Sequence, residues 1–258
     1  MDGARPTLFG VLPVPFGKHP GTRGGYRRTA MTRLLALTVA DAPEVWSGLG
    51  FTVDGVTVRI GSTSIVCSSS AENDPSSKGI TDWMLTADDG PLPERIDGLL
   101  TGSVTYGDAA PRTPTTPPHH TNGVISIDHL VVMTPDVDRT VTALEDLGLE
   151  CRRRREGAAY GSATMRQAFF WLGHPDGPAD ERVILEVVGP DVVDPAKAND
   201  PAKFFGLALT CADLDSTTAF FGDLMKAPVE AVQAGRRIAT LSSRAGSTVA
   251  IAMMSPHN

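Results

Sequence analysis

The stretch Ile127-Asp128-His129-Leu130-Val131-Val132-Met133-Thr134-Pro135-Asp136-Val137-Asp138 joins an apolar run to a helix-start signal. The run 124–133 predicts a strand, and the Thr-Pro-Asp that follows predicts a helix over 136–147, because Thr or Asp can cap the first free amides. Valine and leucine recur at helical spacing along that helix, and Gly148 ends it. Three more strands are predicted at 150–155, 164–172 and 182–188. The order is β-α-β-β-β.

The same order recurs further along the chain. A strand is predicted over 204–210 and a helix over 213–226, followed by strands near 229, 236–241 and 248–254. Thr-Pro-Asp-Val-Asp-Arg-Thr at 134–140 aligns with Cys-Ala-Asp-Leu-Asp-Ser-Thr at 211–217, and the alignment also superposes Arg166 on Arg236 once one loop is adjusted. This internal repeat predicts two modules, 124–190 and 203–256, that complete a shared core in one domain, 124–258.

The N-terminal half contains fainter copies of this pattern. Residues 34–67 suggest a shortened module and 80–106 a more truncated one, within a domain spanning 31–108. An unrelated small α+β cap is the alternative. The predicted fold class is therefore α+β, built from tandem βαβββ modules with a degenerate N-terminal pair.

Two segments are predicted to lie outside these domains. Residues 1–30 are rich in Gly, Pro and Arg without periodicity, which is typical of a disordered tail. Residues 109–123 contain four prolines in a polar run and predict a semi-rigid linker. We expect His119 and His120, within that linker, to be solvated.

Composition excludes several classes of partner. The net charge of −7 argues against broad attraction to nucleic acid or anionic membranes, and no run of 18 apolar residues could span a bilayer. Three widely spaced cysteines predict reduced thiols and a cytoplasmic protein. The pair Arg27-Arg28 before an apolar run also resembles a twin-arginine signal, but Arg33 interrupts the run.

The sequence 127–138 resembles the opening of a vicinal oxygen chelate module, the unit of glyoxalase-like, bleomycin-resistance and extradiol dioxygenase proteins. Val-Ile-Leu-Glu-Val-Val-Gly-Pro at 183–190 resembles its closing strand. The resemblance implies a cup formed by paired modules, in which a first-strand histidine and a last-strand glutamate bind a divalent metal. His129 and Glu186 fall on those positions, so the resemblance implies them as metal ligands and Glu186 as the catalytic residue.

The chemistry of Glu186 points the same way. A carboxylate within Ile-Leu-Glu-Val-Val costs several kcal/mol to bury unless a cation or strong donors accompany it. A histidine with a carboxylate suits Zn, Ni, Mn or Fe.

The second module departs from the pattern, because Gly206 stands at the histidine position and Ala252 at the glutamate position. Two protein ligands are fewer than catalytic metals normally have, so the cofactor is either a divalent metal or none. Three interpretations stay open. The pair is structural, with the histidine donating to the carboxylate; or a homodimer completes a metal site across its two-fold axis; or the pair contacts the ligand directly or holds a metal weakly with water.

Four residues on the equivalent third strands are the predicted ligand contacts: Arg166, Gln167, Arg236 and Arg237. Strand alternation places one of each neighbouring pair on the cup, where an arginine favours a carboxylate, enolate or phosphate. The run 152–155 of four arginines is expected to be solvated or to face the rim.

Triad, P-loop, dinucleotide and zincin motifs are absent from the sequence. The favoured hypothesis is a glyoxalase-like lyase, isomerase or dioxygenase that acts on a small molecule. The alternative is a non-catalytic, drug-sequestering protein of the bleomycin-resistance type, which needs only an apolar cup.

Overall fold

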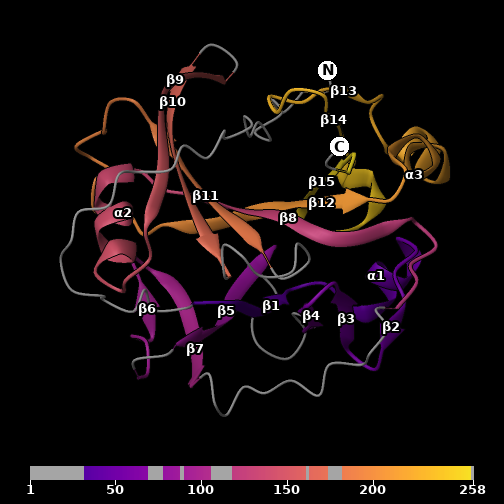
Figure 1. Ribbon diagram of the computed structural model, residues 1–258, viewed down its shortest axis with the longest axis horizontal. Coiled ribbons are helices and arrows are strands. Elements are labelled where there is room, and N and C mark those ends of the chain that lie inside the picture. Colours follow the sequence, from indigo (N-terminus) through magenta and orange to yellow (C-terminus); the bar gives the residue numbers. More distant parts are fainter. Residues whose placement is uncertain are drawn as a thin grey trace, which may run out of the picture.

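Two mixed β-sheets stack on one another in the computed structural model (Figure 1). The structure describes residues 32–68, 78–87, 90–105, 118–160, 163–173 and 182–256. The predicted N-terminal tail and most of the predicted linker, 109–117, lie outside these residues.

The C-terminal sheet contains two βαβββ modules, as predicted. Its strands run in the order β13-β14-β15-β12-β8-β11-β10-β9, so the first strands of the two modules, β8 and β12, are antiparallel neighbours at its centre. The first module consists of β8 Val124–Met133, α2 Val137–Glu145, β9 Cys151–Tyr160, β10 Ala163–Leu172 and β11 Val183–Pro190. The second consists of β12 Lys203–Cys211, α3 Leu214–Phe221, β13 Val229–Glu230, β14 Arg237–Thr240 and β15 Ala250–Met254.

The helices begin where the sequence predicts and end earlier. Asp136 caps α2 by accepting from the Arg139 amide, and Asp213 caps α3 by accepting from the amides of Asp215 and Ser216. Helix α3 stops at Phe221 and a 3₁₀ turn follows, because Gly222 adopts a positive φ of 52° that breaks the helix.

The N-terminal sheet repeats the plan in reduced form. Its order is β2-β3-β4-β1-β5-β7-β6, with β1 and β5 antiparallel at the centre. The first N-terminal module is a complete βαβββ unit, whereas the described residues of the second, 80–87 and 90–105, form three strands and no helix. The elements are β1 Leu34–Val39, α1 Pro43–Gly48, β2 Val53–Asp54, β3 Thr57–Ile60, β4 Thr63–Cys67, β5 Ile80–Ala87, β6 Arg95–Ile96 and β7 Leu99–Thr105.

The strand ladders show which residues of the two C-terminal modules are equivalent. His129 pairs with Ile184 in the first module and Gly206 with Ala250 in the second, so Gly206 and Ala252 are the counterparts of His129 and Glu186. The predicted superposition of Arg166 on Arg236 is wrong by one residue. Gln167 pairs with Val188 and Ile238 with Met254, which makes Arg237 the counterpart of Arg166.

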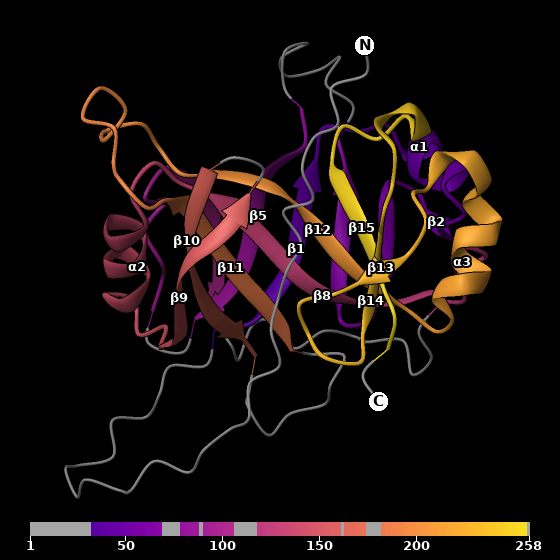
Figure 2. The same cartoon turned by 90° about the horizontal axis from the view of Figure 1, so that it is seen from above.

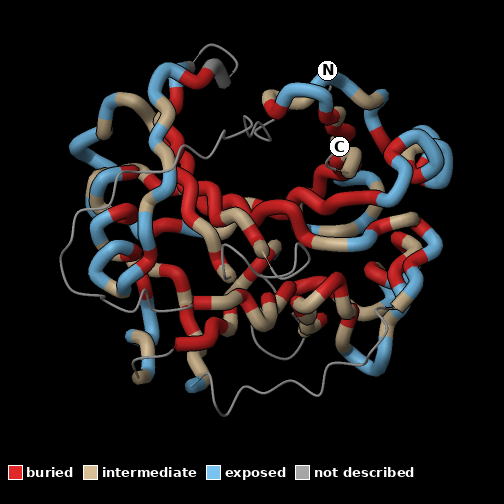
Figure 3. Tube along the Cα trace, viewed as in Figure 1, coloured by how far each residue is buried: buried red, intermediate tan, exposed pale blue. Residues whose placement is uncertain are grey.

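One apolar core fills the space between the sheets and under the helices. Trp83 of β5 meets Phe204 of β12 with ring centroids 5.4 Å apart, which joins the two sheets. Helices α2 and α3 cover the flanks of the C-terminal sheet on this same side (Figure 2). Buried residues follow the central strands in Figure 3. The other side of the C-terminal sheet is its concave face, toward which the edges β9 and β13 curve (Figure 1).

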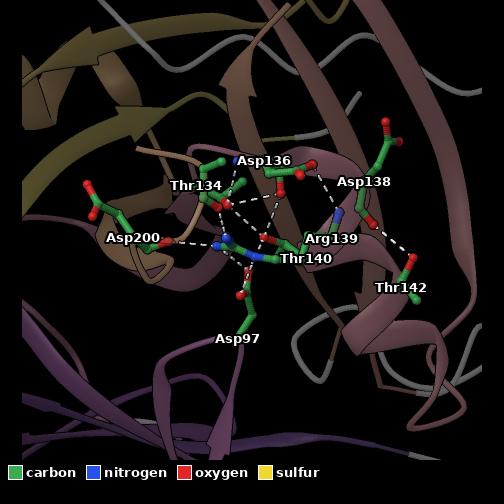
Figure 4. A network of polar contacts seen from close by, with 9 residues as sticks. Asp97, Thr134, Asp136, Asp138, Arg139, Thr140, Thr142 and Asp200 are labelled. Carbon is green, nitrogen blue, oxygen red and sulfur yellow. Dashed lines mark hydrogen bonds and ion pairs between the residues drawn. The ribbon is translucent and has the colours of Figure 1, made fainter. Parts of the chain in front are cut away.

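A polar network fixes the N-terminal sheet to helix α2 (Figure 4). Asp97, in the tight β6–β7 turn with a φ of 48°, lies 2.7 Å from Arg139 Nε and accepts a hydrogen bond from the Thr140 hydroxyl. Arg139 also donates to the carbonyls of Ala198 and Asp200. The Arg139 guanidinium thus joins three segments that are distant in the sequence: its own helix, the β6–β7 turn and residues 198–200.

The expectation that His120 is solvated is wrong. The side chain is 2% exposed, its Nδ1 accepts from the Thr52 amide at 3.1 Å, and its Nε2 lies 2.8 Å from the Arg59 carbonyl. His119 is exposed, as expected. The end of the predicted linker is therefore part of the fold, because it satisfies backbone groups of the first N-terminal module.

Cys67 and Cys211 are buried free thiols and Cys151 is a half-buried one, as the cysteine spacing predicts. Burial raises the pKa of Cys67 and of Cys211 to about 11, so both thiols are protonated at neutral pH. In the described part of the chain, no helix has the length and apolar character to cross a bilayer.

Candidate functional site

His129 of β8 and Glu186 of β11 lie together on the concave face. Neither side chain is exposed, and His129 Nε2 is 3.7 Å from Glu186 Oε2. They are neighbours because β8 and β11 are paired in parallel and their side chains project from adjacent rows. The distance is longer than a hydrogen bond, so the two groups are close but do not form the predicted donor–acceptor contact.

The histidine donates elsewhere. Its Nδ1 lies 2.9 Å from Asp128 Oδ2, and because an ionised carboxylate can only accept, Nδ1 carries the proton. In the neutral imidazole this leaves Nε2, the atom nearest Glu186, as the acceptor. Neighbouring residues on a strand normally face opposite sides, but the β8–β12 ladder shifts register between His129 and Ile127, and this irregularity lets Asp128 and His129 interact.

Glu186 has one strong hydrogen bond and one oxygen without any. Its Oε1 accepts from Gln167 Nε2 at 2.6 Å, whereas Oε2 has no hydrogen-bond partner among the described residues. Burial raises the pKa of Glu186 from 4.5 to about 7, although the nearby His129 and Gln167 lower it. The carboxyl group is therefore able to give or take a proton near neutral pH.

Arg236 supports this pair from the second module. It is 2% exposed and its Nη1 lies 2.7 Å from Asp128 Oδ1. Its remaining donors reach the Gln233 side chain, the Thr210 hydroxyl and the Ser255 carbonyl. Because protein acceptors take up the guanidinium, we assign Arg236 to holding Asp128, and through it His129, in place.

Two of the predicted ligand contacts lie on the other side of the sheet. Arg166 binds Asp138 of α2, and Arg237 binds Asp215 of α3 in the same way. The two ion pairs hold each helix against its own module. Of the four predicted contacts, the structure brings only Gln167 directly to Glu186.

An apolar surface surrounds the pair on the concave face. It is formed by alternate residues of the two modules, which is why it is separate from the main core. Its buried members are Val131, Met165, Val188, Ala208, Ile238, Ala252 and Met254, with Met133, Phe205 and Ala231 packed against them. The seven buried members are at most 8% exposed, so they form the packed apolar base of this face.

A metal held by one chain does not fit these side chains. In residues 32–256, leaving out the gaps named above, no group of three or more His, Cys, Asp or Glu side chains could hold an ion. A Cβ at Gly206 would lie 2.2 Å from the Ala250 carbonyl oxygen, so no side chain can occupy that position without backbone movement. His129 and Glu186 supply two ligands where catalytic metals normally have three. Metal binding by this pair stays a prediction that needs ligands from outside the described residues.

The comparisons with known proteins agree on the fold. No family model and no curated protein matches the chain. A solved structure of a 4-hydroxymandelate synthase variant from Streptomyces coelicolor superposes with a TM-score of 0.59 at 13% identity, over 88% of this chain and 93% of that chain. Methylmalonyl-CoA epimerase from Mycobacterium tuberculosis matches 55% of this chain and 94% of its own at 17% identity, with a TM-score of 0.40. The chain has the glyoxalase-like, vicinal oxygen chelate fold in a four-module arrangement.

Sequence reasoning missed Asp128 and the two arginines of β9 that face the concave side, Arg153 and Arg155. Asp128 stands next to His129 in the most informative stretch of the sequence, but strict alternation places it on the opposite face. The arginines were grouped in one run, although they pair with Phe169 and Gln167 on the concave face. Applying alternation inside the run would have separated them.

Proposed function

We propose that this protein is a small-molecule enzyme of the isomerase or lyase type, which moves a proton with His129 and Glu186. The observation that carries the proposal is a fully buried carboxyl group beside an imidazole on an apolar concave face. Groups whose pKa is shifted toward neutrality by burial are typical of general acid–base sites.

The proposed step is removal of a proton from a carbon next to a carbonyl group. The Glu186 carboxylate takes the proton through Oε2, and the electron pair of the broken C–H bond moves onto the carbonyl oxygen to give an enolate. Gln167 holds the other carboxyl oxygen, which fixes the orientation of the base. Return of the proton to the same or the other face completes an isomerisation.

In this proposal His129 exchanges a proton with the Glu186 carboxyl group. With Nδ1–H bound to Asp128, its Nε2 can accept a proton from Glu186 and give it back. This gives His129 a role in the first module, although the second module has Gly206 and Ala252 at the equivalent positions.

A second function has its own support. The apolar surface and the missing ligand positions in the second module also suit a protein that binds and sequesters a small molecule without converting it. In that case Glu186 would contact the ligand without exchanging a proton with it.

Proton exchange separates the two functions. The purified protein is incubated in D₂O with a panel of 2-oxo acids, β-dicarbonyl compounds and thioesters, and deuterium uptake at carbon is followed by proton NMR. We expect exchange with at least one compound class, reduced about a hundredfold or more in Glu186→Gln. Glu150→Gln, at an exposed glutamate paired with Arg152, is the control and should exchange normally.

Exchange that persists in Glu186→Gln would contradict the assigned role of the carboxyl group. Binding of a compound without any exchange in the wild type would favour the sequestering protein.

A further inference from the structure

The four arginines of β9 are divided between the two sides of the sheet. Arg154 pairs with Ala168 in the ladder and its guanidinium binds Asp138 of α2, on the helix side. Arg153 pairs with Phe169 and Arg155 with Gln167, so both project from the concave face. The edge strand β9 therefore carries two positive charges on the face that holds His129 and Glu186.

These two arginines differ from their neighbours in their partners. Arg152 and Arg154 each form an ion pair with a carboxylate, to Glu150 and Asp138. Within the described ranges, neither Arg153 nor Arg155 lies within ion-pair distance of a carboxylate, and both are half-buried. Two half-buried guanidinium groups two residues apart on a strand repel each other, and an anion between them would relieve that repulsion.

Two successive hydrogen bonds link Arg155 to Glu186, the proposed base. Arg155 Nη1 lies 3.4 Å from Gln167 Oε1, and Gln167 Nε2 donates to Glu186 at 2.6 Å. Arg153 adjoins Phe169, whose other ladder partner is Glu186. Strand β10 alone separates β9 from β11, so the strand axes are about 10 Å apart, a span that a small molecule and an arginine side chain cover together.

We infer that Arg153 and Arg155 form a subsite for a carboxylate group of a small carbonyl substrate. The inference rests on the proposed function for the position of the reacting carbon, which lies toward Glu186, and it adds the chemical class of the substrate. The planar guanidinium groups suit a carboxylate, and Phe169 offers an apolar surface to the carbon skeleton between the two ends. The two charges also oppose the negative charge that an enolate develops beside a carboxylate.

Anion binding tests the subsite without any turnover. Malonate is titrated into the full-length protein in low-salt buffer, with binding followed by calorimetry and ligand-observed NMR. Malonamide, which has the same skeleton without charge, and inorganic phosphate are titrated in parallel. We expect malonate to bind, malonamide to bind at least about tenfold more weakly, and sodium chloride to weaken malonate binding.

The arginine variants assign the binding to β9. Arg153→Gln and Arg155→Gln should each weaken malonate binding about tenfold or more. Arg154→Gln, which lies between them on the helix side, should leave it within about twofold. Circular dichroism of each variant confirms that the fold is kept. Unchanged binding in both variants, equal loss in Arg154→Gln, or binding of phosphate but not malonate would each overturn the carboxylate subsite.

A fourth variant separates this inference from the proposed function. Glu186→Gln removes a negative charge near the arginines, so it should bind malonate at least as well as the wild type. If malonate binds as expected but no compound exchanges its proton, the subsite stands and the enzyme function fails. If exchange occurs and depends on Glu186 but not on Arg153 or Arg155, the enzyme function stands and the carboxylate subsite fails.

Discussion

Glu186 is costly to the fold in its charged form. It is fully buried, one of its oxygens accepts no hydrogen bond from the described residues, and its pKa is raised to about 7 because burial disfavours the charge. A purely structural pair would be expected to satisfy both oxygens, as buried polar groups generally do. Local cost of this kind is more typical of functional positions, where stability is given up for reactivity.

The pH dependence of unfolding follows from this carboxyl group. Its folded-state pKa, about 7, lies above its ordinary value of 4.5, so its contribution to stability is complete below pH 4.5 and is lost as pH rises through 7. We therefore expect Glu186→Gln to unfold less readily than wild type at pH 8, by on the order of 3 kcal/mol. The advantage should disappear near pH 4.5.

Chemical denaturation of both proteins at pH 4.5, 6 and 8 measures this difference. A variant that is less stable than wild type at pH 8 would show that the carboxylate stabilises the fold, which is the expectation for a structural ion pair.

How well the site residues could be predicted depended on strand geometry. His129 and Glu186 are both predictable, because each stands in an apolar strand at a position that the family resemblance implies. The contact of Asp128 with His129 is not predictable, because it depends on the register shift in β8, and no sequence pattern indicates that irregularity. The choice between Arg236 and Arg237 needed the register of β14, which the repeat alignment missed by one residue.

Among the connecting elements, the segment around His120 has the clearest structural role. Residues 118–123 lead into β8, and His120 packs its ring against Phe51 with centroids 5.1 Å apart. Both ring nitrogens contact backbone groups, one accepting from the Thr52 amide and the other facing the Arg59 carbonyl. Proline content predicts a linker over 109–123, of which 109–117 lie outside the described residues, but it could not show that the last residues are anchored.

Lowering the pH should weaken the stabilisation that His120 gives to this segment. Burial lowers the pKa of His120 below its ordinary 6.5 because it disfavours the charged ring, although the hydrogen bond to the Arg59 carbonyl raises it. Protonation would also place a donor opposite the Thr52 amide. The stabilisation is therefore complete above pH 6.5 and is lost as pH falls through the lowered pKa. We expect His120→Gln to reduce the free energy of unfolding at pH 7.5 by about 1–2 kcal/mol and to flatten its pH dependence below 6.5.

His119→Gln is the matched control, since the His119 side chain is exposed and the substitution keeps the backbone carbonyl that accepts from the Thr52 hydroxyl. Because the charge of His119 helps to lower the pKa of His120, this control should shift the pH profile slightly upward without removing it. Glu186 is present in all three proteins, so its opposite effect on the pH dependence of unfolding cancels when each variant is compared with wild type between pH 5 and 7.5. Equal pH profiles for the wild type and His120→Gln would contradict the role given to this ring.

The two sheets share a plan but differ in chemical content. The sequence predicted the C-terminal βαβββ pair because each of its modules repeats a strand followed by a helix with an aspartate cap, and the fold class is confirmed. The N-terminal pair is fainter in the sequence and reduced in the structure. The back-to-back contact of the sheets could not be predicted, since it depends on distant groups such as Asp97 with Arg139 and Trp83 with Phe204. The central strands also carry different side chains: in the N-terminal sheet Thr38 of β1 donates to Asp82 of β5, whereas in the C-terminal sheet β8 carries His129.

A metal site shared between two chains is the interpretation that links metal content to assembly. Because the described residues bring together two candidate ligands, His129 and Glu186, we expect incubation with Zn, Ni, Mn or Fe, followed by desalting, to leave much less than one ion per chain. Plasma mass spectrometry on untagged protein, with light scattering for the mass, checks this. Near one ion per two chains, lost in His129→Ala, would contradict the expectation and indicate a site shared across a two-fold axis.

The contact between Gly206 and the Ala250 carbonyl limits what variation can achieve in the second module. A histidine introduced at 206 would meet the Ala250 backbone, and a carboxylate introduced at 252 would leave position 206 without a ligand. No single substitution can therefore make the two halves alike, and the change at 206 also requires the backbone of β12 or β15 to move. Libraries that seek a new metal activity should first vary the spacing of β12 and β15, and only then the side chains.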